Sequence, residues 1–148
     1  MSDHAFLFTQ KDWLGEGTIQ LSNVEDELKF YTRWNMDGAD AGGEISAVQE
    51  VQIQGISDVM LNQFMLRSVT SNGFSLELEN ASLGLITGKG IVKDDLIAWE
   101  YRDPEMGFDG FEFYERQKDG SYILRAEYAT PDQTRTIIQG RIWQKGEK

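Results

Sequence analysis

Apolar and polar side chains alternate along almost the whole chain, in short runs separated by glycines and polar turns. Alternation with a period of two is typical of strands that bury one face and expose the other. Helical periodicity is sustained almost nowhere, and only residues 5–13 suggest a short helical turn before the first strand. The pattern predicts ten strands, at residues 16–22, 27–36, 44–54, 60–70, 74–81, 84–92, 96–102, 110–118, 121–129 and 134–144.

Short turns join most of these strands, which favours an antiparallel up-and-down order. Since no helix is available to cover a sheet face, ten strands are best closed into a barrel, which removes exposed edges. We therefore expect residues 1–148 to form a single domain of the all-β class. Its architecture should be a ten-stranded antiparallel up-and-down barrel with a short N-terminal helical turn.

The turns also predict which side chains face the interior. Asp119-Gly120 fits a two-residue hairpin loop with positive φ at both positions. This loop would direct Phe111 and Phe113 into the barrel and leave Glu112 and Tyr114 on the outer surface.

A second turn, Asp94-Asp95, would place Trp99 opposite Gly90 and Tyr101 opposite Gly88. Aromatic rings often cover glycines on a neighbouring strand, so both rings are expected inside. The resulting interior is rich in rings: Phe30, Trp34, Phe64, Phe74, Trp99, Tyr101, Phe111, Phe113 and Tyr128. A ten-stranded barrel is wider than one that side chains fill completely, so these rings either plug the interior or line a cavity.

Both ends of the chain carry family-like motifs. The opening Trp13-x-Gly15-x-Gly17 and the closing segment 140–145, Gly-Arg-Ile-Trp-Gln-Lys, resemble those of calycin barrels: lipocalins, fatty-acid-binding proteins and nitrobindin-like proteins. The resemblance implies a ligand-binding barrel. It gives Arg141 two alternative roles, packing over Trp13 or anchoring a ligand carboxylate. Haem-binding nitrobindins use a histidine near the C-terminus, whereas the only histidine here is His4, so haem is not expected.

Composition narrows the function classes. The 25 acidic and 14 basic side chains give a net charge of −11, and the basic residues are scattered, which argues against nucleic-acid binding and docking on anionic lipid. The chain has no cysteine, no visible signal peptide and no apolar run long enough to insert into a membrane. We expect a cytoplasmic protein without metal or cofactor, and a homodimer is one arrangement that the sequence allows.

Catalytic motifs are weak. Without cysteine and with a single histidine near a terminus that we expect to be flexible, the common nucleophile–base pairs are missing. Glu115, which shares the parity of Phe111 and Phe113, and Tyr101 are the acid–base candidates for an enzyme.

The sequence therefore favours binding of a small hydrophobic or amphipathic ligand inside the barrel, without catalysis. The predicted ligand-binding residues are Phe30, Trp34, Trp99, Tyr101, Phe111, Phe113, Tyr128 and Arg141. Two alternatives stay open: a small enzyme of the isomerase, cyclase or hydratase type, and a filled barrel that binds a protein partner through loop 103–109. A cavity below about 300 Å³ would weaken both the ligand-binding and the enzyme hypotheses.

Overall fold

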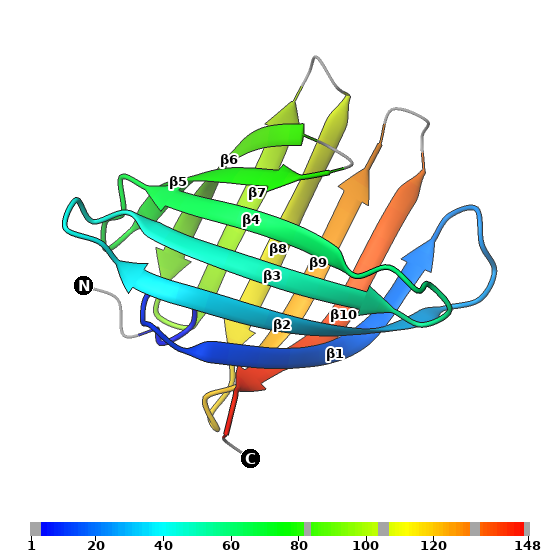
Figure 1. The fold of residues 1–148 in the computed structure, drawn as a ribbon, viewed down its shortest axis with the longest axis horizontal. Helices are drawn as coiled ribbons and strands as arrows, with labels where there is room; N and C mark the ends of the chain where they lie inside the picture. Colours follow the sequence, from blue (N-terminus) through cyan, green and yellow to red (C-terminus); the bar gives the residue numbers. More distant parts are fainter. Residues whose placement is uncertain (1–3, 82–83, 104–106, 131–133, 147–148) are drawn as a thin grey trace.

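The computed structural model describes residues 4–81, 84–103, 107–130 and 134–146, which form a closed barrel (Figure 1). Every strand pairs antiparallel with its neighbours in sequence, and the first strand closes on the last. The predicted ten-stranded up-and-down barrel is confirmed. Its strands are β1 (Asp12–Leu21), β2 (Leu28–Ala39), β3 (Ile45–Ile53), β4 (Met60–Arg67), β5 (Gly73–Asn80), β6 (Gly84–Lys93), β7 (Leu96–Asp103), β8 (Phe108–Arg116), β9 (Tyr122–Ala129) and β10 (Arg135–Gln144).

On most of the strands, the side chains predicted to face the interior do lie in the core. In β2, Phe30, Thr32, Trp34 and Met36 are buried and their neighbours point outward. The turn before β7 also gives the predicted pairs, Gly90 with Trp99 and Gly88 with Tyr101. One detail differs, because the ring that lies against Gly90 is that of Phe74 rather than that of Trp99.

The face of β8 is the opposite of the predicted one. Phe113 lies on the outer surface with 42% of its area exposed, and Phe111 shares its parity and packs against it with ring centroids 5.0 Å apart. Glu112 and Tyr114 are buried instead, opposite the inward residues of β9. Glu115, expected at the inner face, is exposed.

The reason is the length of the β8–β9 loop. Gly120 N–H donates to the Gln117 carbonyl at 3.0 Å, and Gln117 N–H donates to the Ser121 carbonyl at 2.7 Å. Gly120 has a φ of +88°, so the loop is a turn followed by a left-handed glycine, a three-residue connection. One more loop residue than expected shifts the register by one and turns every β8 side chain to the other face.

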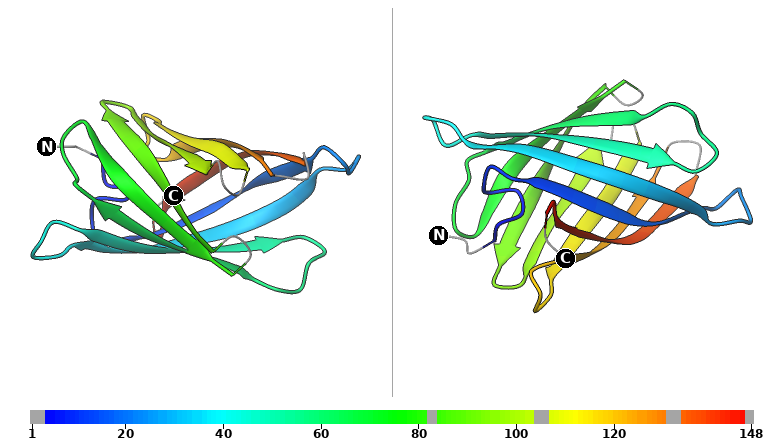
Figure 2. Two further views of the ribbon diagram at one scale, coloured as in Figure 1. Left: turned by 90° about the horizontal axis from the view of Figure 1, so that it is seen from above. Right: turned by 60° about the horizontal axis from the view of Figure 1, so that its bottom comes forward.

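The segment before β1 plugs one end of the barrel. Residues 4–11 form turns and bends rather than the expected helical turn, and they fold back under the barrel end nearest the N-terminus (Figure 2). Phe6 and Leu7 are fully buried there. His4 was expected in a flexible tail, but it is 3% exposed and its Nε2 donates to the Lys93 carbonyl at 2.6 Å. We call residues 4–11 the N-terminal plug.

The opening motif closes the barrel. Gly17 pairs with Gly140 across the β1–β10 seam, and a Cβ atom on Gly17 would lie 2.0 Å from the Gln139 carbonyl oxygen. The absence of a side chain at Gly17 therefore lets β1 and β10 approach closely. Trp13 is buried beside the N-terminal plug.

Arg141 takes neither of its predicted roles. Its side chain runs over the outside of the barrel, where it pairs with Asp119 at 2.5 Å and donates to Ser121 Oγ at 3.0 Å. The alternation of β10 explains this placement, because Ile142 is the inward residue. In the described part of the chain, no helix has the length and apolar character that crossing a bilayer requires.

Candidate functional site

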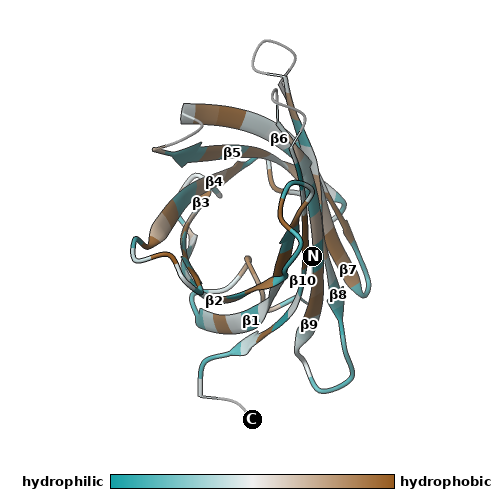
Figure 3. Cartoon of the chain, turned by 90° about the vertical axis from the view of Figure 1, so that its right-hand side faces the viewer, coloured by the Kyte–Doolittle hydropathy of each residue, from teal (hydrophilic) through white to brown (hydrophobic). Residues whose placement is uncertain are grey.

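The end of the barrel opposite the N-terminal plug holds a cavity of about 330 Å³. A view turned to the side shows how the strands curve around this interior (Figure 3). The last residues of β1, β3, β5, β7 and β9 and the first residues of β2, β4, β6, β8 and β10 lie at this end, which we call the mouth. The cavity is lined mainly by apolar side chains: Ile19, Leu21, Leu28, Phe30, Val51, Ile53, Ile56, Met60, Phe64, Leu78, Phe108, Leu124, Ala126 and Ile138.

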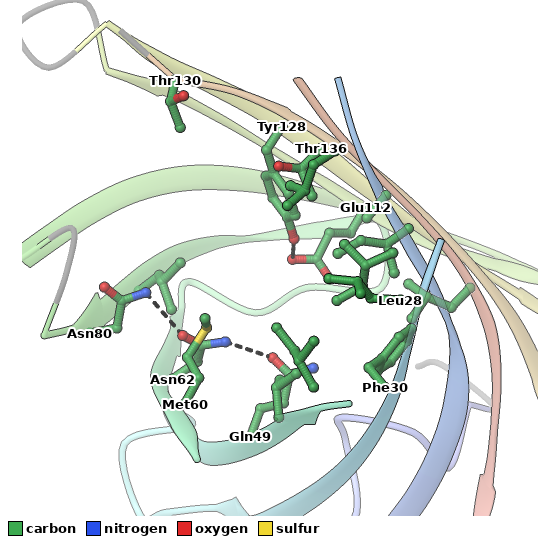
Figure 4. A pocket seen from close by; sticks show the side chains of 18 of the residues that line it. Leu28, Phe30, Gln49, Met60, Asn62, Asn80, Glu112, Tyr128, Thr130 and Thr136 are labelled. Atoms are coloured by element: carbon green, nitrogen blue, oxygen red, sulfur yellow. Dashed lines mark hydrogen bonds between the residues drawn. The ribbon is translucent and has the colours of Figure 1, made fainter. Parts of the chain in front are cut away.

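The polar groups of the lining lie on two walls. Glu112 and Tyr128 come from β8 and β9, and Gln49, Asn62 and Asn80 come from β3, β4 and β5 (Figure 4). Thr130 and Thr136 complete the lining. An apolar cavity with a few polar groups is the usual form of a small-molecule site.

Glu112 is the centre of a buried hydrogen-bond cluster. Tyr114 donates to Oε1 at 2.6 Å, Tyr101 donates to Oε2 at 3.3 Å, and Tyr128 also donates to Oε2. Trp99 Nε1 donates to the Tyr101 hydroxyl at 2.8 Å, and this hydrogen bond holds the Tyr101 hydroxyl in position beside Glu112. We call Glu112, Tyr101, Tyr114 and Tyr128 the carboxylate cluster.

Burial controls the ionisation of the carboxylate cluster. Removal from water raises the pKa of Glu112 above its usual value, although hydrogen bonds from Tyr114, Tyr128, Trp99 and Tyr101 act in the opposite direction. The pKa of each tyrosine in the cluster is raised well above 10, first by burial and then by the negative charge of Glu112. The three phenols are therefore neutral donors at ordinary pH.

The opposite wall carries a chain of amides that we call the amide ladder: Gln49, Asn62 and Asn80. Asn80 Nδ2 donates to Asn62 at 3.0 Å, and Asn62 Nδ2 donates to Gln49 at 3.0 Å. Gln49 Nε2 then donates to the hydroxyl of Thr32 at 3.2 Å. Since consecutive members satisfy one another, the amide ladder needs no ligand to complete it.

The predicted site residues fall into three groups. Phe30 and Tyr128 line the cavity. Trp34, Trp99 and Tyr101 are buried inside the barrel but do not line the cavity. Tyr101 belongs to the carboxylate cluster, and Trp99 donates a hydrogen bond to it. Phe111, Phe113 and Arg141 lie on the outer side of the wall, so their predicted inward orientation was wrong. Residues 104–106 of the loop suggested as a partner site lie outside the described residues.

Sequence reasoning missed Glu112 and the amide ladder. Glu112 was assigned to the outer face with the rest of the β8 register. The ladder residues did carry a signal, because each stands at an inward position of its predicted strand, two residues from an apolar one. Three amides at inward positions of three consecutive strands indicate a polar stripe on the inner wall.

The raised pKa of Glu112 predicts a pH-dependent cost to stability. Below about 4.5 the carboxyl is protonated in both the folded and the unfolded chain. As the pH rises, the unfolded chain loses its proton first, so stability falls until the pH passes the folded-state pKa. Each unit of pKa difference corresponds to about 1.4 kcal/mol.

We therefore expect the free energy of unfolding of the natural protein, relative to that of Glu112→Gln, to decrease between about pH 4.5 and neutral pH. Urea unfolding of both proteins across this range measures the difference, in which the contributions of all other carboxylates cancel. A difference that stays constant with pH would contradict the raised pKa.

No protein-family model matches the chain, and comparison with curated proteins also found no match. The fold and the site thus define the protein only as a closed ten-stranded antiparallel β-barrel with an internal cavity.

Proposed function

We propose that the protein is a calycin-like barrel that binds a small, mainly apolar molecule in its internal cavity. The observation that carries this proposal is the combination of about 330 Å³ of space, a lining dominated by apolar side chains and a buried polar cluster on one wall. The volume lies near the lower end of the range for ligand sites, so the ligand should be about the size of two fused rings. The opening motif and the strand order support the calycin-like assignment.

Burial of apolar ligand surface supplies the affinity in this proposal. Each Å² removed from water contributes roughly 25 cal/mol, and the cost of ordering the ligand reduces the total. The N-terminal plug fills the other end of the barrel, so the ligand enters at the mouth and rests against Phe30, Leu124 and Ile138.

A neutral fluorescent probe tests the proposal. We expect 1-naphthalenemethanol to bind one molecule per barrel, with a dissociation constant on the order of 10 µM. Binding should change the probe emission and raise the melting temperature of the protein. If neither this alcohol nor the corresponding amine and acid binds, a filled barrel is the better description.

A second function, proton-transfer catalysis, is favoured by one observation. Glu112 is a buried carboxyl of raised pKa at a cavity wall, which suits a general acid or base. It replaces Glu115 as the candidate group, because Glu115 is exposed on the outer face. Mass spectrometry of a molecule that copurifies with the protein separates the two functions: a binder returns it unchanged after incubation, whereas an enzyme converts it and Glu112→Gln abolishes the conversion.

A further inference from the structure

We propose that the cavity selects ligands that carry a protonated amine on an apolar body, with Glu112 as the counter-ion. This inference rests on the proposed binding function and names the chemical class of the ligand. It differs from one of the two roles predicted for Arg141, in which that residue would anchor a ligand carboxylate.

The charge of the lining is the first argument. Among the described residues that line the cavity, only Glu112 and Tyr128 have an ionisable side chain. None of the described lining residues is a lysine, an arginine or a histidine. A ligand carboxylate would therefore lose its water without meeting a cation and would lie near another carboxylate. Both effects disfavour acids.

The hydrogen bonds around Glu112 give the second argument. All three phenols are placed to donate to its oxygens, an arrangement that suits an ionised carboxylate, which only accepts. Such a buried charge lacks a cationic partner in the described lining. A ligand ammonium group would supply that partner, and pairing is what makes a buried charge tolerable.

The surroundings of the carboxylate cluster fit a cation as well. Phe30, Phe64, Phe108 and Tyr128 present aromatic rings to the cavity, and ring faces attract ammonium groups. The net charge of −11 raises the concentration of cations near the surface. The members of the amide ladder hydrogen-bond to one another, so the ladder does not favour an amine over an alcohol or an acid.

A proton and an ammonium group compete for Glu112 in this scheme. Burial raises the pKa of the carboxyl in the empty cavity, so protonation is one way to neutralise it. When the amine binds, the carboxyl must be ionised, and any proton it holds is released. Amine affinity should therefore fall relative to alcohol affinity as the pH is lowered.

The test compares three probes with the same bicyclic skeleton: 1-naphthylmethylamine, 1-naphthalenemethanol and 1-naphthoic acid. At neutral pH we expect the amine to bind at least tenfold more tightly than the alcohol and the acid to bind most weakly. Glu112→Gln should reduce amine affinity at least tenfold and leave alcohol affinity within about threefold. Glu115→Gln is the matched control, because it removes the same charge from the exposed face of the same strand and should change neither affinity.

The outcomes separate the two proposals. If the alcohol binds as tightly as the amine, or the acid binds best, the amine inference is wrong and ligand binding stands. If no probe binds, the proposed function itself fails. The natural protein provides a test that needs no variant: the ratio of amine to alcohol affinity should fall from neutral pH towards about 4.5, and a constant ratio would overturn the role of Glu112.

Discussion

Replacing Phe6 with alanine should lower the free energy of unfolding by about 3–5 kcal/mol. Its ring is fully buried and contacts four other aromatic side chains. The centroid distances are 5.4 Å to Trp13, 5.2 Å to Trp34, 4.8 Å to Tyr114 and 5.4 Å to Tyr122. Removing the ring leaves a void among rings that belong to four different strands, β1, β2, β8 and β9, which cannot all collapse into it.

Phe113→Ala is the matched control for Phe6→Ala. It removes the same ring from the outer face of β8, where 42% of the side chain is exposed, and should cost less than about 1 kcal/mol. Urea unfolding, monitored by tryptophan fluorescence, measures both variants. Equal losses, or a larger loss for Phe113→Ala, would mean that β8 has the register first expected from its sequence and that residues 4–11 do not plug the barrel.

The N-terminal plug shows why part of the fold could not be predicted. Its residues have no sustained period of two or of 3.6, and a segment without periodicity gives no sign of what it covers. His4 and Phe6 become buried only because the barrel wall around them is complete. Their burial is a consequence of tertiary structure, and no local pattern encodes it.

The wall of the barrel was predictable where each strand had a single apolar face. In β2 the alternation is unambiguous, and the structure follows it. In β8 both faces carry aromatic rings: Phe111 and Phe113 lie on one face, and Phe108 and Tyr114 lie on the other. The prediction of the β8 register therefore depended on the length of the β8–β9 loop alone. Glycine at the end of that loop is compatible with two or three loop residues, and the choice between them reverses the strand.

The predicted position of Glu112 depended on the assumed length of the β8–β9 loop. With the two-residue loop, Glu112 lies in water beside other charges; with the three-residue loop, it lies inside, among Tyr101, Tyr114 and Tyr128. Strand number and aromatic content left open whether the rings fill the interior or line a cavity, and the electrostatic character of the cavity could not be predicted. One of the two roles predicted for Arg141 was to anchor a ligand carboxylate, whereas the structure places Arg141 outside the barrel and Glu112 at the cavity wall.

Filling the cavity should have the largest effect on binding. Ala126 is buried, points inward from β9 and lines the cavity opposite Glu112. In Ala126→Phe, a phenyl ring enters this space, and a ring needs on the order of 150 Å³ of the 330 Å³ available. We expect the affinity for 1-naphthylmethylamine and 1-naphthalenemethanol to fall at least 100-fold, because a bicyclic ligand no longer fits.

The fold of Ala126→Phe should survive, since the new ring occupies existing space and overpacking costs no more than about 1–3 kcal/mol. Ala129→Phe, on the same strand with the side chain on the other face, is the control and should bind both probes like the natural protein. Fluorescence titration gives the affinities, and thermal unfolding verifies folding. If Ala126→Phe is folded and still binds normally, the ligand site lies outside the barrel interior, because no bicyclic molecule could share the remaining space with the introduced ring.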